Sequence, residues 1–155
     1  LAYFAERADA QMLATLARDY DMPALKIRER IATAVMVRLR LLAPHREAVR
    51  RAVGYYTLPW HTAAGLKALY ATVDAMWRAA GDTSTDYNFY TKRLLLSKVY
   101  STTLHVWLGD QSDNLADTEA FLRRRIEDVM KIEKYKAKAI TQWHKLEEWL
   151  PKFGR

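Results

Sequence analysis

Apolar residues recur every three or four positions along most of the chain, which is the pattern of amphipathic helices. The spacing predicts helices over residues 1–20, 27–42, 44–57 and 66–80. Pro23 precedes the second helix, where its missing N–H costs nothing, and Gly81 closes the fourth as a residue just beyond a helix C-terminus. In the second helix the apolar stripe runs from Ile27 to Leu42. Four arginines are placed off this stripe: Arg28, Arg30, Arg38 and Arg40.

The second half of the chain continues as helix after a polar loop over residues 82–86. Residues 89–108 are apolar on nearly all faces. Such a helix is central in its domain, packs against another subunit, or lines a cavity, and the pattern leaves these three open. Gly109 ends this helix, and residues 110–114 form a turn that caps the next one. The buried face of that next helix is formed by Phe121, Leu122, Ile126, Val129 and Met130. We therefore expect one all-α domain without internal repeats.

The amino-acid composition says more about the possible partners of the chain than about its fold. A length of 155 residues fits one domain, and the absence of Cys excludes disulfides and thiolate chemistry. The net charge of +7 favours an anionic partner, which could be nucleic acid, an acidic protein or a membrane surface. No apolar stretch is long enough to span a bilayer. The chain begins with Leu rather than Met, which is compatible with a fragment of a longer protein.

The sequence contains no recognisable catalytic or metal-binding motif. The four histidines do not pair at metal-ligand spacing, and the acidic residues from Asp110 to Asp117 lack the Gly and Glu of a calcium loop. The nucleophile elbow, the P-loop and the dinucleotide-binding glycine motif do not occur. The basic run at 123–125 splays around its helix and is best explained by a solvated face with local ion pairs. We therefore expect no catalytic residue, no metal and no catalytic cofactor.

The C-terminal stretch combines an apolar stripe with positive charge. Seven basic and three acidic residues leave +4 over residues 131–155. Six apolar or aromatic side chains are candidates for membrane binding: Ile140, Trp143, Leu146, Trp149, Leu150 and Phe153. This pattern fits a helix at an anionic membrane surface, and equally a last helix docked on the body of the protein. We divide the chain accordingly into a ligand-binding domain over 1–134 and a C-terminal amphipathic helix over 135–155.

Residues 73–93, here called the signature segment, read VDAMWRAAGDTSTDYNFYTKR. This segment closely resembles the signature of the Coq-nine family of ubiquinone-biosynthesis accessory proteins. The leucine-rich continuation over 94–103, the Asp-Gln-Ser run at 110–112 and residues 118–126 also follow the family pattern. The strong similarity extends from about residue 58 to 130.

The resemblance implies a TetR-like fold that is adapted to bind lipid, here as a helical ligand-binding domain lacking its N-terminal helix-turn-helix. It implies a bound lipid or isoprenoid quinone as ligand, and no other cofactor. The implied partners are a di-iron hydroxylase of the Coq-seven type that acts on demethoxyubiquinone, an anionic membrane surface and a second copy of the chain, but no nucleic acid. The implied location is peripheral to the inner membrane, on the cytoplasmic side in a bacterium or the matrix side in a mitochondrion.

The resemblance also selects residues for two surfaces. Carried over by position, the partner-binding residues are Asp74, Met76, Asp86, Phe89, Tyr90, Lys92 and Arg93. The apolar stripes at 66–77 and 94–108 are expected to line a lipid cavity. Its predicted residues are Leu66, Leu69, Tyr70, Val73, Trp77, Leu95, Val99, Tyr100, Leu104 and Trp107. The alternative function is the ligand-sensing domain of a TetR-type transcriptional repressor, which a basic helix-turn-helix upstream would favour.

Overall fold

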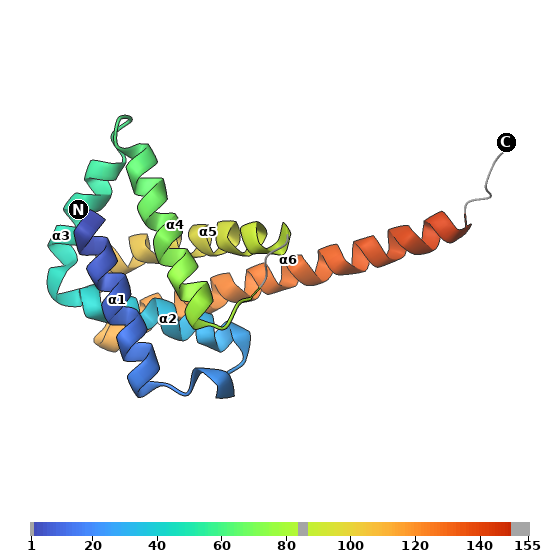
Figure 1. The fold of residues 1–155 in the computed structure, drawn as a ribbon, viewed down its shortest axis with the longest axis horizontal. Helices are drawn as coiled ribbons and strands as arrows, with labels where there is room; N and C mark the ends of the chain where they lie inside the picture. The colour runs from blue at the N-terminus through green and yellow to red at the C-terminus, as the bar shows by residue number, and fades with distance from the viewer. Residues whose placement is uncertain (1, 84–86, 150–155) are drawn as a thin grey trace.

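The computed structural model describes residues 2–83 and 87–149, except for the side chains of residues 87, 88, 133 and 143–149. The described chain is helical and contains no strand (Figure 1). Its α-helices are α1 (Ala2–Asp19), α2 (Ile27–Leu42), α3 (Arg46–Tyr56), α4 (Thr62–Ala79), α5 (Tyr87–Gly109) and α6 (Ala116–Trp149). Short 3-10 turns at Met22–Ala24, Ala43–His45 and Asp113–Leu115 precede α2, α3 and α6. The all-α prediction is confirmed.

Helix boundaries follow local chemistry. The amide of Gly81 donates to the carbonyl of Arg78, and the amide of Asp82 donates to the carbonyl of Trp77, both at 3.0 Å. This pair of bonds is the Schellman motif, which requires a residue with positive φ beyond the helix end. Gly81 has φ +84°, so the predicted end of α4 is confirmed. The start of α4 lies four residues before the predicted 66, because Thr62 and the residues after it also take helical conformation.

Helix α2 is the centre of the bundle, since it contacts α1, α4, α5 and α6. Nine of its residues are buried, among them Val35 and Leu39, which are 0% exposed. Around it, α1 packs on α4, α4 on α5, and α5 on α6. Helix α5, which sequence pattern made a candidate for the central position, exposes Leu94 at 73%. The α2 sequence achieves burial with small and branched residues, which let neighbouring helices approach closely.

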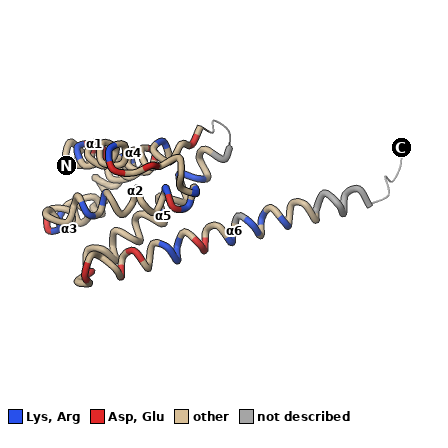
Figure 2. The backbone as a smooth tube through the Cα atoms, turned by 90° about the horizontal axis from the view of Figure 1, so that it is seen from below, with Lys and Arg blue, Asp and Glu red and all other residues tan. Residues whose placement is uncertain are grey.

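Helix α6 continues well beyond the bundle and is the longest element (Figures 1 and 2). It runs without interruption across the boundary that the sequence placed between residues 134 and 135. Residues 135–149 therefore continue the same helix and do not form a separate C-terminal helix. The reason is local, because neither Gly nor Pro occurs between residues 116 and 149 and nothing stops the helix.

Candidate functional site

An apolar pocket of about 340 Å³, here called the first pocket, lies among helices α1 to α5. Four of the residues predicted to bind lipid line it: Leu66, Leu69, Tyr100 and Leu104. The other walls include Phe4 from α1, Leu42 from α2, and Val53 and Tyr56 from α3. A mostly apolar concavity of this size matches the dimensions of small-molecule sites in proteins.

One wall of the first pocket is polar. Arg38, Thr72 and Tyr100 line the pocket, and Asp9 pairs with them from α1; we call these four residues the buried tetrad. Arg38 Nε donates to Asp9 Oδ1 at 2.7 Å, and its Nη atoms donate to the Tyr100 hydroxyl at 2.5 Å and to Thr72 Oγ1 at 3.3 Å. Thr72 Oγ1 in turn donates to the Asp9 carboxylate. The tetrad joins four helices and is at most 9% exposed.

The charge states of the buried tetrad follow from its surroundings. Burial by itself disfavours the charged guanidinium, but the oxygens of Tyr100 and Asp9 outweigh it and raise the pKa of Arg38. Burial raises the pKa of Tyr100, although Arg38 opposes this. The phenol therefore stays neutral at physiological pH while Arg38 and Asp9 form an ion pair.

A second pocket of about 570 Å³ lies among α2, α4, α5 and α6. Three predicted lipid-binding residues line it: Trp77, Leu95 and Val99. Ile126 and Met130 of α6 complete its apolar wall, and Arg28 and Lys92 add positive charge. The single cavity expected from sequence is thus two pockets, one along each half of α5.

Three residues of the predicted lipid set line neither pocket. Val73 and Trp107 are 0% exposed and belong to the solid core, where Arg46 lies over the Trp107 ring at 4.9 Å. Tyr70 is 42% exposed on α4. The prediction that Val73 and Trp107 line a cavity is wrong, because a helical stripe does not reveal whether it faces another helix or an empty space.

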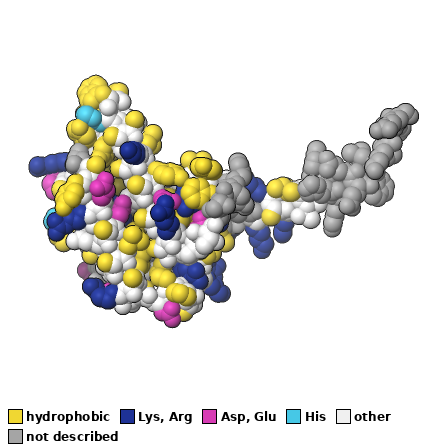
Figure 3. Space-filling view, in the orientation of Figure 1, with side chains coloured by type: hydrophobic (Ala, Val, Ile, Leu, Met, Phe, Trp, Pro, Cys, Tyr) yellow, Lys and Arg dark blue, Asp and Glu magenta, His cyan; other side chains and the backbone are white. Residues whose placement is uncertain are grey.

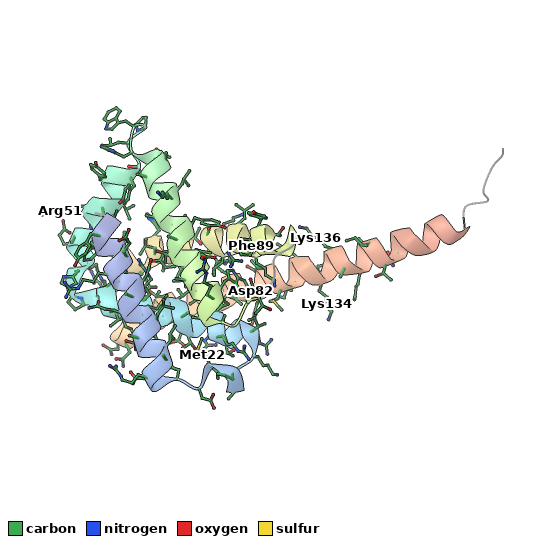
Figure 4. All side chains as sticks on the ribbon, viewed as in Figure 1. Met22, Arg51, Asp82, Phe89, Lys134 and Lys136 are labelled. Atoms are coloured by element: carbon green, nitrogen blue, oxygen red, sulfur yellow. The ribbon has the colours of Figure 1, made fainter. Side chains whose placement is uncertain are left out.

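The signature segment is held together by a buried ion network. Arg93 Nε donates to Asp74 Oδ1 at 2.7 Å, and Arg93 Nη1 donates to Asp82 Oδ2 at 3.1 Å. Lys92 Nζ donates to the other oxygen of Asp82 at 2.8 Å, and the Arg93 guanidinium lies over the Phe89 ring. Trp77 Nε1 donates to the Lys92 carbonyl at 3.1 Å. Figure 4 places Asp82 and Phe89 together where α4 ends and α5 begins.

This network corrects the predicted partner-binding surface. Arg93 is 1% exposed and Met76 is 0% exposed, so neither is available to a partner. Met76 faces the core, and Arg93 turns inward because two carboxylates there neutralise it. Tyr90, at 66%, is exposed, whereas Phe89, Lys92 and Asp74 are partly buried. Asp86 lies outside the described residues.

Hydrophobic side chains also gather on the outside of the molecule. In Figure 3 they cap the turn between α3 and α4, where Trp60 is 73% exposed and Leu58 is 39% exposed. On the outer part of α6, Ile132, Tyr135 and Ile140 are 49%, 71% and 59% exposed. Of the predicted membrane-binding residues, Ile140 is thus accessible. Trp143, Leu146 and Trp149 belong to α6 without described side chains, and Leu150 and Phe153 lie outside the described residues.

Asp110 caps α6, as the predicted turn requires. Its Oδ2 accepts hydrogen bonds from the amide and hydroxyl of Thr118, and its Oδ1 accepts from the amide and hydroxyl of Ser112. Burial by itself raises the pKa of Asp110, but these hydrogen bonds from Ser112 and Thr118 outweigh it and lower the pKa from 3.8 to about 2. The predicted cap is confirmed.

Within the described residues, no group of three or more His, Asp or Glu side chains is arranged to hold a metal ion. None of the helices there is both long and apolar enough to cross a membrane. The buried tetrad was missed from sequence because Arg38 was placed off the apolar stripe. Its spacing from Ile31, Val35 and Leu42 is in helical register, and a charged residue in that register was the available signal.

The fold is that of the TetR class of all-α proteins. The chain is similar to the crystal structure of a TetR transcriptional regulator from Nitrosomonas europaea, with a TM-score of 0.64 and 25% sequence identity. The likeness covers 79% of this chain and 66% of that one.

Within this class, the COQ9 family model matches residues 62–133, so this part of the chain is similar to the COQ9 family. The chain is 43% identical over 97 residues to the human ubiquinone biosynthesis protein COQ9, mitochondrial, covering 63% of this chain and 30% of that protein. It is 35% identical over 136 residues to the Bos taurus protein of the same name, covering 84% of this chain and 43% of that protein. The chain spans less than half the length of these relatives. The predicted Coq-nine resemblance is confirmed.

Proposed function

We propose that this chain is the ligand-binding part of an accessory protein of ubiquinone biosynthesis, which holds a quinone intermediate and presents it to the demethoxyubiquinone hydroxylase. The observation that carries the proposal is the first pocket, an apolar site of about 340 Å³ in a chain whose relatives are named for ubiquinone biosynthesis. Its walls suit a lipid or an isoprenoid quinone, and the proposed role needs no catalytic group.

The second pocket extends the apolar surface available to a ligand. Val99 lines the second pocket and Tyr100, the next residue of α5, lines the first, while no residue lines both. Each pocket is therefore a separate candidate for the apolar parts of a ligand. Trp77 in the second pocket and Tyr100 in the first supply flat aromatic surface.

The surface around Tyr90 is the proposed docking site for the hydroxylase. Tyr90 is exposed next to Phe89, with ring centroids 5.1 Å apart in an edge-to-face arrangement. Lys92 lies on the same helix and lends positive charge. Exposed aromatic residues beside cations are frequent anchors of protein interfaces. The buried ion network of Arg93 with Asp74 and Asp82 lies beneath this surface and supports its conformation.

Helix α6 is the proposed contact with an anionic membrane. Its outer part carries exposed Tyr135 and Ile140 together with lysines at 134, 136 and 138, and Figure 2 marks the basic positions in blue along the backbone of this helix. Apolar side chains bury area at the lipid headgroup layer, and basic side chains are attracted to anionic headgroups, so both contribute to binding. The relatives are named as mitochondrial, which favours the matrix side of the inner membrane over the bacterial counterpart.

A second copy of the chain is the proposed partner of the exposed apolar side chains on α5 and α6. Leu94 is 73% exposed and Met130 is 48% exposed, and both helices present such residues near the second pocket. A symmetric dimer would bury the same patch on both subunits. Analytical ultracentrifugation of the wild type and of Leu94→Glu tests this, since the variant should remain monomeric.

The alternative function, ligand sensing by a transcriptional repressor, is supported by the fold likeness to a TetR regulator alone. The names of the sequence relatives favour quinone biosynthesis instead. A DNA-binding measurement on the longer natural protein separates the two, because a repressor binds a specific duplex with nanomolar affinity and an accessory protein does not.

The central test is native purification followed by extraction and mass spectrometry of bound lipids. The wild type should carry quinone or isoprenoid lipid. Ala68→Phe, which fills the first pocket from α4, should carry much less. Ala71→Phe is the matched control, because Ala71 is exposed on the same helix and lines neither pocket. A wild type free of lipid, or equal lipid in all three proteins, contradicts the proposal.

A further inference from the structure

The polar wall of the first pocket presents hydrogen-bond donors that the protein does not use. A guanidinium has five N–H groups, and three hydrogen bonds to Asp9, Tyr100 and Thr72 account for three of those of Arg38. The Tyr100 hydroxyl accepts from Arg38 but donates to no other residue in the described part of the chain. Both side chains line the pocket, so their remaining N–H and O–H groups are the candidate donors to a ligand there.

Donors in such a place are costly unless they find an acceptor. Arg38 is 5% exposed and Tyr100 is 3% exposed, so bulk water does not solvate them freely. A buried donor without a partner loses the free energy of its hydration, whereas a ligand oxygen restores it. Apolar neighbours such as Leu69 and Leu104 contribute no acceptor.

The charge balance decides which kind of acceptor fits. Asp9 already neutralises Arg38 at 2.7 Å, and Tyr100 is neutral, so the buried tetrad has no net charge. A carboxylate or phosphate would add a buried negative charge without its own counter-ion. His105, the remaining basic residue that lines the pocket, is exposed. A neutral oxygen avoids this penalty.

We infer that the buried tetrad recognises a neutral oxygen acceptor, a carbonyl or ether oxygen at the polar end of an otherwise apolar ligand, with Tyr100 and Arg38 as donors. The inference rests on the proposed function and deepens it by assigning an orientation. The polar end lies against Arg38 and Tyr100, and the apolar tail passes Leu104 towards Leu66, which is 61% exposed. A quinone ring with methoxy groups has this chemistry, and a fatty acid does not.

The test compares three probes that share a decyl-type tail: decylubiquinone, decylbenzene and decanoate. Each displaces a polarity-sensitive dye from the full chain. The wild type should bind decylubiquinone most tightly. Tyr100→Phe removes one hydroxyl and should reduce the affinity for decylubiquinone about tenfold, which is the effect of one buried hydrogen bond. The affinity for decylbenzene should change by less than about twofold.

Tyr56→Phe is the matched control. Tyr56 lines the same pocket from α3 and is not part of the tetrad, so deleting its hydroxyl should leave the affinities for all three probes unchanged. Decylbenzene binding also reports whether Tyr100→Phe keeps an intact pocket. Melting temperatures of the three proteins identify any variant that is not folded, and if Tyr100→Phe is not folded, the preference of the wild type for decylubiquinone over decylbenzene is the test.

The outcomes separate the inference from the proposed function. If the dye and decylbenzene bind but decylubiquinone binds no more tightly than decylbenzene, the inference is overturned, while the proposed apolar ligand site is retained. Equal weakening of decylubiquinone and decylbenzene by Tyr100→Phe also overturns it, because the tetrad then acts only as structure. Tightest binding of decanoate overturns it in favour of an anionic ligand. If neither the dye nor any probe binds, the proposed function fails as well.

Discussion

Arg93 Nε lies 2.7 Å from Asp74 Oδ1, and the side chains that form this ion pair are 2% and 14% exposed. The pair connects α5 to α4 from the inside, and Asp82 extends it to the turn after α4. Arg93, Asp74 and Asp82 therefore have a structural role in this chain. They place Phe89 and Tyr90 rather than meeting a partner themselves.

Replacing Arg93 by Met should strongly destabilise the fold. The change leaves Asp74 and Asp82 without their buried counter-ion, which costs about 3–5 kcal/mol in the free energy of unfolding. Arg78→Met is the matched control, because Arg78 pairs with the same Asp74 at 2.7 Å but is 73% exposed, and its loss should cost less than about 1 kcal/mol. Urea unfolding measures both. Equal losses would mean that the Arg93 pair is not effectively buried.

Charge placed at Tyr90 should weaken hydroxylase binding without affecting stability. Tyr90 is 66% exposed, so Tyr90→Glu should change the free energy of unfolding by less than about 0.5 kcal/mol. Loss of an aromatic anchor should reduce affinity for a Coq-seven type hydroxylase about tenfold. Tyr3→Glu, at a residue 74% exposed on α1, is the control for charge alone. The same affinity for both variants would place the docking surface elsewhere.

Alanine at Gly81 and at Gly54 should shift stability in opposite directions. Gly81 has φ +84°, and an added Cβ would lie 3.2 Å from Arg30 Nη1, so Gly81→Ala should destabilise by about 1 kcal/mol or more. Gly54 lies inside α3, where a Cβ meets nothing within 4 Å, so Gly54→Ala should stabilise by about 0.5–1 kcal/mol. Thermal unfolding followed by circular dichroism measures both. A stabilising Gly81→Ala would contradict the Schellman assignment.

The cap at Asp110 should make the free energy of unfolding depend on pH. Its folded pKa of about 2 lies below the unfolded value, so the carboxylate stabilises the fold above about pH 4. This contribution is lost as pH falls from about 4 to 2, where the folded protein also takes up the proton. Asp110→Asn should cost about 1–2 kcal/mol at pH 7.

The difference in the free energy of unfolding between wild type and Asp110→Asn is the quantity to follow, because other carboxylates cancel in it. The difference should shrink towards zero between pH 4 and pH 2. A difference that is independent of pH would show that the cap does not depend on ionisation.

Membrane binding should depend on the lysines of the outer part of α6. Lys134→Glu with Lys136→Glu should reduce flotation with anionic liposomes, since each basic residue near the surface contributes on the order of 1 kcal/mol. The control is Arg51→Glu with Lys67→Glu, which changes the net charge by the same amount on the body of the protein. Arg51 is 80% exposed there and lies far from Lys134 and Lys136 (Figure 4). Binding should also weaken with salt. Equal flotation of the two double variants would exclude α6 as the contact.

The sequence predicted the helices well because their signals are local. Apolar spacing, Gly81 and the Asp110 turn all act within a few residues, and each appears where it was expected. The start of α4 was predicted too late because its first turn has few large apolar residues. Similar limits hid the continuity of α6, since charge and amphipathicity change along the helix without any break in its backbone.

The site was harder to predict because it depends on contacts between distant residues. Asp9 and Arg38 are 29 residues apart, and Arg38 and Tyr100 are 62 apart, so no spacing rule joins them. The family resemblance selected Arg93 and Met76 by position without indicating that they are buried. In the same way, Val73 and Leu69 share a stripe on α4, yet Val73 fills the core and Leu69 faces a pocket.

The length of α6 has a mechanical consequence. Its 34 residues, at 1.5 Å each, give a rod of about 51 Å that has no Gly or Pro at which to bend. The Asp110 cap fixes one end like a fulcrum, and Ile126 and Met130 form a wall of the second pocket along the way. If the helix stays straight, a tilt of its outer end about this cap would also displace Ile126 and Met130. The shape of the second pocket would then change together with the angle of the outer part of α6.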